Sequence, residues 1–260
     1  MPNPRVTDPL RGVVRTLEVL RAVNDEPGAG VSGLAQRTRI PRPSLYRILE
    51  TLCALGYVQR RDDGEGYAPT ILVRSLSDGF NDETWVRAVA LPVMEALQKE
   101  IVWPTDIASF FDGAMYLRET TRRHSPLTID TARVGLRLPM RQSATGRAYL
   151  AFCSDAERAA IVDRLRRSRT GEDALARDGR YVSNLVTMTR RKGYGERHGE
   201  IFPKTGAIAV PVKHGERVVC CLNISFIASA LTPAEAAARY LEPLNAAARR
   251  IERQLDVASA

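Results

Sequence analysis

The sequence is poor in the residues that build metal sites and disulfide frameworks. Its 260 residues include four cysteines and three histidines, and no two cysteines have CxxC spacing. Cys220 and Cys221 are adjacent, so in a strand their side chains would point to opposite faces, which argues against a disulfide between them. The histidines are scattered along the chain. We therefore expect no metal ion, no cofactor and a reducing, cytoplasmic environment.

Long apolar runs are also missing. The longest, such as Ile208–Val212 and Val218–Leu222, are far shorter than the roughly 20 residues that a membrane-spanning helix requires. Residues 1–8 include Arg5 but no apolar stretch follows it, unlike a signal peptide. The sequence thus predicts a protein with no membrane partner.

What the chain does have is an excess of positive charge, +8 in total. Such an excess favours a polyanionic partner, but many basic proteins bind no nucleic acid, so the position of the charge matters more. Residues 37–61 contain six arginines and one acid, Glu50, for a local net charge of +5. The rest of residues 1–72 holds four arginines and seven acids, a net charge of −3. Positive charge is therefore concentrated in one segment.

Three helices are predicted around that segment. Val13–Val23 carries apolar residues near a 3.6-residue period, and a Pro-Gly pair follows it. A short helix is expected over Ser32–Thr38, because Ser32 is a good N-cap residue. A third begins at about Pro43, since proline is favoured in a first turn, and is closed by Gly56 in the left-handed conformation.

A β-hairpin is expected directly after the third helix, with strands at Tyr57–Arg61 and Gly66–Ala68 and a turn at Asp62–Gly64. Three helices and a hairpin predict a winged helix-turn-helix over residues 8–72 that binds double-stranded operator DNA. Its contacts would come from the third helix and the wing: Arg42, Pro43, Ser44, Tyr46, Arg47, Arg60 and Arg61. The alternative is a helical bundle with a solvated basic face. Arg37 and Arg39 could each be solvated or paired with an acid.

The rest of the chain mixes helices with short apolar strands, which predicts an α+β fold. Apolar residues at intervals of four indicate a helix over Asp82–Glu100. Strands are expected at 107–111, 115–117, 207–212 and 218–226, and helices at 145–153, 155–167, 182–192 and 233–255. Trp103 and Phe110 could stack on an aromatic ligand, although packing in the core is the commoner role of such side chains.

Several ordered segments resemble one protein family. They are LAQRTRIPRPSLYRILETL (34–52), LGYV (55–58), LPMRQSATGRAYLAF (138–152), RKGYG (191–195) and IAVPV (208–212). Together they are similar to the IclR family of bacterial transcription regulators over nearly the whole chain. Within that family, Val102–Asp106 and Arg118–Thr121 resemble activators of hydroxyphenylpropionate and related aromatic-acid degradation.

The resemblance implies a linker helix at 73–100 that aids dimerisation and a GAF-like α/β effector-binding domain at 101–258. It also implies a homodimer or tetramer and a small carboxylate effector, here an aromatic one. RNA polymerase is a further candidate partner. The implied function is an effector-controlled regulator, an activator of an aromatic-acid catabolic operon. The alternatives are a repressor of another carboxylate pathway, an architectural DNA binder, or a ligand-sensing or enzymatic domain whose winged helix mediates protein contacts.

The effector site is expected at the turn Ser143–Gly146, where a helix begins. Backbone N–H groups and the helix dipole favour an anion at such a position. The family match carries over Ala144 and Thr145, and places Arg197 where the family has an acid and Asn223 and Ser225 where it has serines. Arg197 could instead be a solvated loop residue, and Asn223 and Ser225 could be satisfied structurally. Because Ser143 lacks the glycine pattern of a nucleophile elbow, no enzymatic activity is expected.

Overall fold

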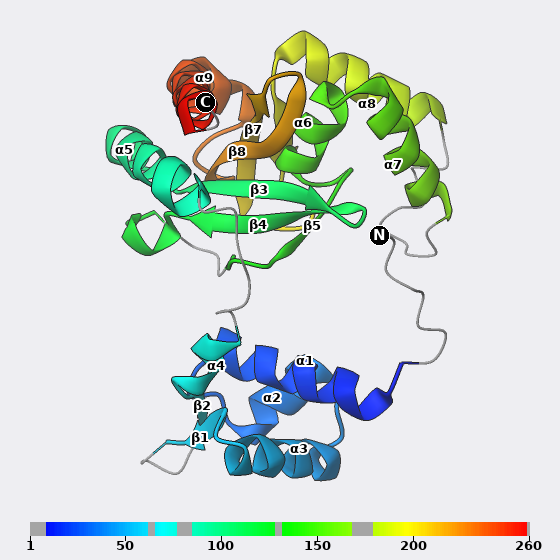
Figure 1. Ribbon diagram of the computed structural model, residues 1–260, viewed down its shortest axis with the longest axis vertical. Helices are drawn as coiled ribbons and strands as arrows, with labels where there is room; N and C mark the ends of the chain where they lie inside the picture. The colour runs from blue at the N-terminus through cyan, green and yellow to red at the C-terminus, as the bar shows by residue number, and fades with distance from the viewer. Residues whose placement is uncertain (1–8, 62–65, 77–84, 128–131, 168–178, 259–260) are drawn as a thin grey trace. The chain divides into compact units, whose positions relative to one another are not determined.

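The computed structural model describes residues 9–61, 66–76, 85–127, 132–167 and 179–258. The chain divides into two compact units, Met1–Asp82 and Glu83–Ala260. The first unit is helical with a small hairpin, and the second packs helices on a six-stranded antiparallel sheet (Figure 1). The predicted α+β class is confirmed.

The first unit contains the three predicted helices and the hairpin. In chain order its elements are α1 (Arg11–Asp25), α2 (Val31–Thr38), α3 (Arg42–Ala54), β1 (Val58–Arg60), β2 (Tyr67–Pro69) and the short α4 (Leu72–Ser75). Val19, Leu34, Leu45 and Leu49 are almost completely buried where the three long helices meet. This apolar cluster fixes the orientation of α3, because its other side is then left to solvent.

The element ends differ from the predicted ones by one or two residues. The N-cap of α2 is Gly30 rather than Ser32, because the chain becomes helical already at Val31. Pro43 occupies the second rather than the first position of α3. Gly56 has a φ of 79°, which confirms the predicted left-handed conformation. The predicted turn at Asp62–Gly64 lies outside the described residues.

The hairpin is held to the helices by backbone hydrogen bonds. The N–H of Gly28 donates to the carbonyl of Tyr67 at 2.8 Å, and the N–H of Tyr67 donates to the carbonyl of Ala29 at 3.2 Å. The segment between α1 and α2 thus lies beside β2. These bonds fix the position of the wing relative to α3.

The second unit is built on one antiparallel sheet with strand order β5-β4-β3-β8-β7-β6. The strands are β3 (Thr105–Phe111), β4 (Ala114–Thr120), β5 (Arg137–Pro139), β6 (Gly195–His198), β7 (Thr205–His214) and β8 (Arg217–Ile227). The four predicted strands are confirmed as parts of β3, β4, β7 and β8. The short strands β5 and β6 were not predicted, because three or four residues carry little alternation.

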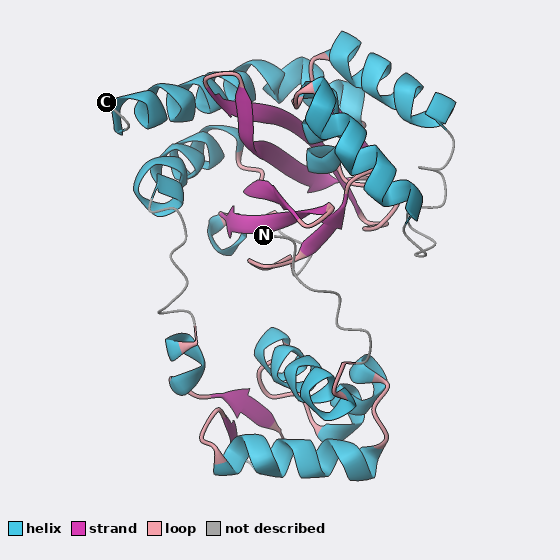
Figure 2. Cartoon of the chain, turned by 45° about the vertical axis from the view of Figure 1, so that its right-hand side comes forward, coloured by secondary structure: helices cyan, strands magenta, loops and turns pink. Residues whose placement is uncertain are grey.

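The helices of this unit lie on both faces of the sheet (Figures 1 and 2). They are α5 (Leu91–Ile101), α6 (Ala144–Phe152), α7 (Asp155–Arg167), α8 (Gly179–Lys192) and α9 (Pro233–Ala258), with a 3₁₀ turn η2 at Arg122–His124. A π-helical segment, η1 (Val86–Ala90), precedes α5. Pro92 has no N–H to donate to the preceding turn, which accounts for the widened turn at this point. Of the linker helix expected at 73–100, residues 77–84 lie outside the described part of the chain.

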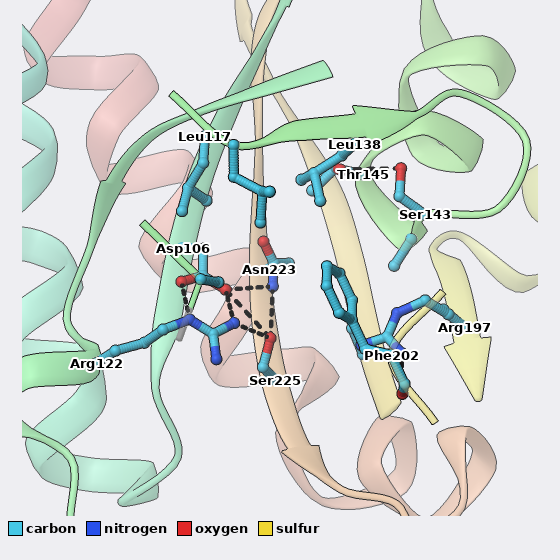
Figure 3. Close-up of a pocket in the computed structure, with 14 residues that line it drawn as sticks. Asp106, Leu117, Arg122, Leu138, Ser143, Thr145, Arg197, Phe202, Asn223 and Ser225 are labelled. Atoms are coloured by element: carbon cyan, nitrogen blue, oxygen red, sulfur yellow. Dashed lines mark hydrogen bonds and ion pairs between the residues drawn. The ribbon is translucent and has the colours of Figure 1, made fainter. Parts of the chain in front are cut away.

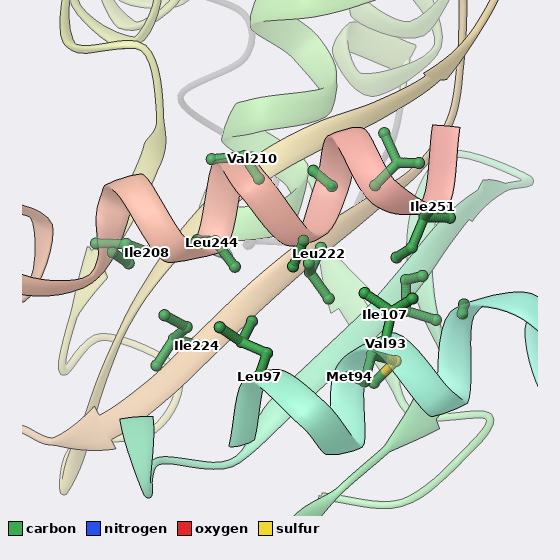
Figure 4. Packing of buried hydrophobic residues seen from close by; sticks show 14 of the residues in the cluster. Val93, Met94, Leu97, Ile107, Ile208, Val210, Leu222, Ile224, Leu244 and Ile251 are labelled. Carbon is green, nitrogen blue, oxygen red and sulfur yellow. The ribbon is translucent and has the colours of Figure 1, made fainter. Parts of the chain in front are cut away.

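Alternation along β8 gives the unit two cores. Cys220, Leu222 and Ile224 belong to the apolar cluster under α5 and α9 (Figure 4), whereas Cys221 belongs to the cluster under α6. The predicted opposite orientation of Cys220 and Cys221 is therefore confirmed. Asn223 and Ser225 share the α6 face with Cys221, because side chains of a strand alternate. The buried polar side chains of β8 therefore lie on the face of the sheet that α6 covers.

A close backbone contact sets the position of α6 on the sheet. A Cβ atom added to Gly195 in β6 would lie 2.2 Å from the carbonyl oxygen of Ala144 and 2.6 Å from the backbone nitrogen of Ala148. Both are main-chain atoms of α6 and cannot rotate away.

We therefore expect Gly195→Ala to lower the free energy of unfolding by about 1–3 kcal/mol, as overpacking does in a close-packed interior. Thermal or urea unfolding followed by circular dichroism measures the change. Gly12→Ala is the control, since a Cβ added there would have no atom within 4 Å. It should leave stability unchanged or raise it by up to about 1 kcal/mol. Equal stability of Gly195→Ala and the wild type would contradict the close contact.

Candidate functional site

The exposed side of α3 carries most of the side chains predicted to contact DNA. Leu45, Leu49 and Leu52 point into the core, and this leaves the opposite side to solvent. Arg42, Pro43, Tyr46 and Arg47 are exposed there, and Ser44 is half-buried. Tyr46 is 43% exposed, so its ring and hydroxyl are open to solvent. A helix with such a face at its N-terminal half has the form of a recognition helix.

The wing adds two arginines next to this helix. The Nε of Arg60 donates to the hydroxyl of Tyr67 at 3.2 Å, and its guanidinium lies 5.6 Å from the centre of the Tyr67 ring. This hydrogen bond raises the pKa of Arg60. Arg61 lies over Gly28, with its Nη1 3.1 Å from where a Cβ of that glycine would be. Both residues are exposed.

The remaining arginines of the basic segment have different surroundings. Arg37 pairs with Asp25 at 2.7 Å and with Glu26 at 3.6 Å, so of its two predicted alternatives the ion pair is confirmed. Arg42 donates from Nη2 to the hydroxyl of Ser32 at 3.0 Å, which links α3 to α2. Arg39 follows α2 in the left-handed conformation and is exposed.

A pocket in the second unit lies between the sheet and the start of α6 (Figure 3). It encloses about 370 Å³, including its opening to solvent. It is lined by Asp106, Leu117, Arg122, Ala132, Leu136, Leu138, Ser143, Ala144, Thr145, Arg197, Phe202, Ala207, Asn223 and Ser225. Six of the seven predicted effector residues are among them.

The start of α6 forms one wall of this pocket. Ser143 is the N-cap; its Oγ accepts from the N–H of Gly146 at 3.0 Å and donates to the carbonyl of Pro139 at 2.7 Å. The N–H groups of Ala144 and Thr145 have no partner within the helix, as in any first turn. They are therefore available to an anion.

Gly146, the seventh predicted residue, does not line the pocket. A Cβ at this position would lie 2.3 Å from the carbonyl oxygen of Met140. Glycine is needed because the main chain before α6 crosses this close to the helix. The packing role of Gly146 was not visible in the sequence.

Arg197 is buried in β6, so the alternative that it is a solvated loop residue is wrong. Its side chain donates to the carbonyls of Gly199, Phe202 and Thr205 at 2.7, 3.1 and 2.6 Å, and to the hydroxyl of Thr205 at 2.9 Å. The guanidinium also lies 5.2 Å from the centre of the Phe202 ring. These contacts hold a positive charge at the pocket wall. Contact between Arg197 and a ligand remains a prediction.

Asp106 and Arg122 also line the pocket, and sequence reasoning missed both. Their side chains form a buried ion pair, with Arg122 Nη2 2.7 Å from Asp106 Oδ2 and Arg122 Nε 3.0 Å from Oδ1. Asp106 lies directly opposite Asn223 in the β3–β8 pairing. The only sign of the site in the sequence is an acid, Asp106, at the start of an apolar strand. The residues that hydrogen-bond to it lie far along the chain: Thr120 is 14 residues away and Asn223 is 117 residues away. Sequence spacing does not show such a pairing.

Asn223 and Ser225 belong to the same network. Asn223 Nδ2 donates to Asp106 Oδ2 at 3.0 Å and to Ser225 Oγ at 3.2 Å. Ser225 Oγ donates to Asp106 Oδ2 at 3.1 Å and accepts from Arg122 Nη2 at 2.9 Å. Their structural hydrogen bonds, one of the two predicted alternatives, are confirmed, while ligand contact remains a prediction.

The two aromatic residues considered as stacking partners lie elsewhere. Trp103 is buried in the core under α5 and α9, on the other face of the sheet. Phe110 stacks on Tyr149 in α6, with ring centres 5.1 Å apart. Both pack in the core, and neither is among the residues that line the pocket.

Comparison with known protein families identifies both parts of the chain. Residues 12–62 match the IclR helix-turn-helix domain, and residues 81–253 match the C-terminal domain of the bacterial transcriptional regulator IclR. The chain belongs to the IclR family. The first match contains α3 and β1, and the second contains the whole lining of the pocket. As a member of this family, the protein is a DNA-binding transcriptional regulator with an effector-binding domain, and not an enzyme.

Individual relatives are distant but cover most of the chain. The regulator KdgR of Dickeya chrysanthemi is 26% identical over 252 residues, which is 95% of this chain and 81% of that protein. The Pca regulon regulatory protein of Pseudomonas putida is 26% identical over 255 residues, covering 95% and 85%.

Solved structures share the fold. An IclR homolog of Microbacterium hydrocarbonoxydans, complexed with 4-hydroxybenzoate, superposes with a TM-score of 0.65 at 22% identity, covering 96% of this chain and all of that one. The IclR of Thermotoga maritima has a TM-score of 0.68 at 18% identity, covering 94% of this chain and 98% of that one.

Among the helices of the described residues, none has both the length and the apolar composition of a membrane-spanning segment.

The buried ion pair gives a prediction for stability. Asp106→Asn would remove the charge opposite Arg122, whose side chain is only 9% exposed. We expect a loss of about 3 kcal/mol in the free energy of unfolding, since breaking one side of a buried pair leaves the other charge uncompensated. Urea unfolding of the full chain measures it.

Asp112→Asn is the matched control. Asp112 pairs with Arg164 at the surface, where both side chains are more than half exposed. Exposed pairs contribute about 0–1 kcal/mol, so this variant should unfold like the wild type. Equal destabilisation by the two substitutions would show that burial of the Asp106–Arg122 pair is not what matters.

Proposed function

We propose that this IclR-family regulator is a cytoplasmic activator of an aromatic-acid catabolic operon and that a small aromatic carboxylate in the pocket controls it. It would bind operator DNA as a homodimer or tetramer, with α3 of each subunit in a major groove and the wing on the flanking backbone. Effector binding would favour one of two states of the oligomer and so change its engagement with promoter DNA and RNA polymerase.

The observation that carries the proposal is the pocket at the start of α6. The N–H groups of Ala144 and Thr145 and the positive end of the helix dipole are there. The charged side chains that line the pocket are two arginines, Arg122 and Arg197, and one acid, Asp106. Both features favour an anionic ligand, and a carboxylate can accept both N–H groups at once.

An aromatic ligand is supported by the remaining walls. Leu117, Leu136, Leu138 and Phe202 offer an apolar surface beside the polar end. A flat ring with one carboxylate would match this combination of apolar walls and few polar groups. A homolog of the same fold is complexed with 4-hydroxybenzoate, which is such a compound.

The first test is thermal unfolding with chosen acids. Benzoate and 4-hydroxybenzoate should raise the unfolding temperature of the full chain, because a ligand at 100 times its Kd adds about 2.7 kcal/mol to stability. Benzamide, which has the same shape without the charge, and acetate, which has the charge without the ring, are the matched controls. A shift with benzamide equal to that with benzoate would contradict an anion site at α6. In vitro transcription with the binding acid should then show activation rather than release of repression.

The second test concerns the reading face. On a duplex selected from a random pool, Arg47→Ala should weaken specific binding by about 1–3 kcal/mol, as loss of a base contact does. Arg60→Ala should weaken binding to all sequences, with a salt dependence shallower by about one unit, as loss of a phosphate contact does. Gel-shift titrations at several salt concentrations measure both.

Arg37→Ala is the control, because that guanidinium already pairs with Asp25 and Glu26. It should change neither the affinity nor the salt dependence appreciably. Wild-type binding by Arg47→Ala and Arg60→Ala together would show that another face of the first unit contacts DNA.

A further inference from the structure

The amide of Asn223 has a fixed orientation in the pocket. Asn223 is 5% exposed, and its Nδ2 donates to Asp106 Oδ2 and to Ser225 Oγ. Turning the amide over would set its oxygen against a carboxylate oxygen that can only accept. Asp106 therefore determines which end of the Asn223 amide faces the pocket.

Ser225 reinforces this orientation. Its single hydroxyl hydrogen goes to Asp106 Oδ2, and its oxygen accepts from Arg122 Nη2 and from Asn223 Nδ2. One donor and two acceptor positions are all that a hydroxyl has. Ser225 thus has no hydrogen to offer to a turned Asn223, and its own capacity for a ligand is already used.

The oxygen of Asn223 is left pointing the other way. Figure 3 shows Oδ1 directed away from Asp106, toward the side where Leu117 and Leu138 lie. Leu117 and Leu138 line the same pocket. Within the described residues, no donor lies in hydrogen-bond contact with this oxygen. A nearly buried acceptor facing a pocket needs a partner, which must come from water or from a ligand.

We propose that Asn223 selects effectors that carry a hydrogen-bond donor, such as a hydroxyl group, in addition to the carboxylate. Asp106 is a positioning residue that holds the amide with its acceptor toward the ligand. The proposal rests on the proposed function, because it assumes that this pocket binds the effector. It adds the chemistry of a second polar group, and it assigns discrimination to Asn223 rather than to Ser225.

Discrimination would come from unequal treatment of three related ligands. The three ligands differ in the substituent that faces Oδ1 of Asn223. A hydroxyl can donate to Oδ1, whereas a hydrogen atom in its place leaves Oδ1 without a partner. A methoxy group places a second acceptor against Oδ1. Sites built to bond a ligand hydroxyl reject analogues that lack it, because a buried polar group is then left unpaired. The expected order of affinity is hydroxyl, then hydrogen, then methoxy.

The test is titration calorimetry of the full chain with 4-hydroxybenzoate, benzoate and 4-methoxybenzoate. We expect 4-hydroxybenzoate to bind about tenfold or more tightly than benzoate, and methoxybenzoate to bind more weakly than both. A second pair, 3-hydroxybutyrate and butyrate, distinguishes an aliphatic hydroxyl from a phenolic one. A preference for the hydroxyl in either pair supports the proposal and identifies the source of the donor.

Two variants test the assigned residues. Asn223→Ala should reduce the hydroxyl preference to about one, because the acceptor is gone. Asp106→Asn should also reduce it and should raise the relative affinity for methoxybenzoate, since Asn223 can then turn its NH₂ group to the ligand. A merely structural role of Asp106 would change all affinities together and leave the ratio as it is. Asn245→Ala, a half-buried asparagine of α9 outside the pocket, is the matched control and should keep the wild-type ratio.

The outcomes separate the two proposals. If none of the acids binds, the proposed function is overturned and this inference with it. If acids bind but the wild type does not prefer the hydroxyl in either pair, or if Asn223→Ala keeps the preference, the inference alone is overturned. The wild-type ratios decide the matter even where a variant fails to fold.

Discussion

The pairing of β3 with β8 is the constraint on which the second unit depends. β8 lies between β3 and β7 in the sheet and is buried on both faces. Its alternate residues close the core under α5 and α9 with Leu222 and Ile224, and line the pocket with Asn223 and Ser225. The register sets Asp106 opposite Asn223. A slip by one residue would turn the carboxylate into the apolar core, so the packing of one face enforces the polar arrangement of the other.

Polar side chains can be buried under α6 because they form hydrogen bonds with one another. Asp106 accepts from Thr120, Arg122, Asn223 and Ser225, so its burial costs little in lost hydrogen bonds. A half-satisfied network of this kind would be worse than an apolar wall. Under the proposed function, the groups left for a ligand include the first N–H groups of α6 and the oxygen of Asn223.

In the first unit, the position of the charged residues matters more than their total number. Residues 1–82 hold 11 arginines and 10 acids, so +7 of the total charge of +8 belongs to residues 83–260. Total charge is thus no guide to DNA binding in this chain. Local placement is the better guide, because Arg42, Arg47, Arg60 and Arg61 are exposed on α3 and the wing, while Arg37 is occupied by Asp25. The apolar cluster that includes Leu45 and Leu49 leaves the side of α3 with Arg42 and Arg47 exposed to solvent.

The sequence by itself determined the helices, the long strands and the family. Periodic apolar residues, as in α3, and Gly56 at its end are local signals that need no tertiary context. It also located Ser143, Ala144 and Thr145, because a helix start is a local feature. Only the tertiary structure decided that Arg197 is buried, that Gly146 serves packing, and that Asp106 and Arg122 line the pocket beside Asn223. The network of Asp106, Arg122 and Asn223 depends on strand register and on contacts between residues up to 117 positions apart. The burial of Arg197 and the packing of Gly146 depend on how the nearby chain folds back on itself, which no periodic sequence pattern indicates.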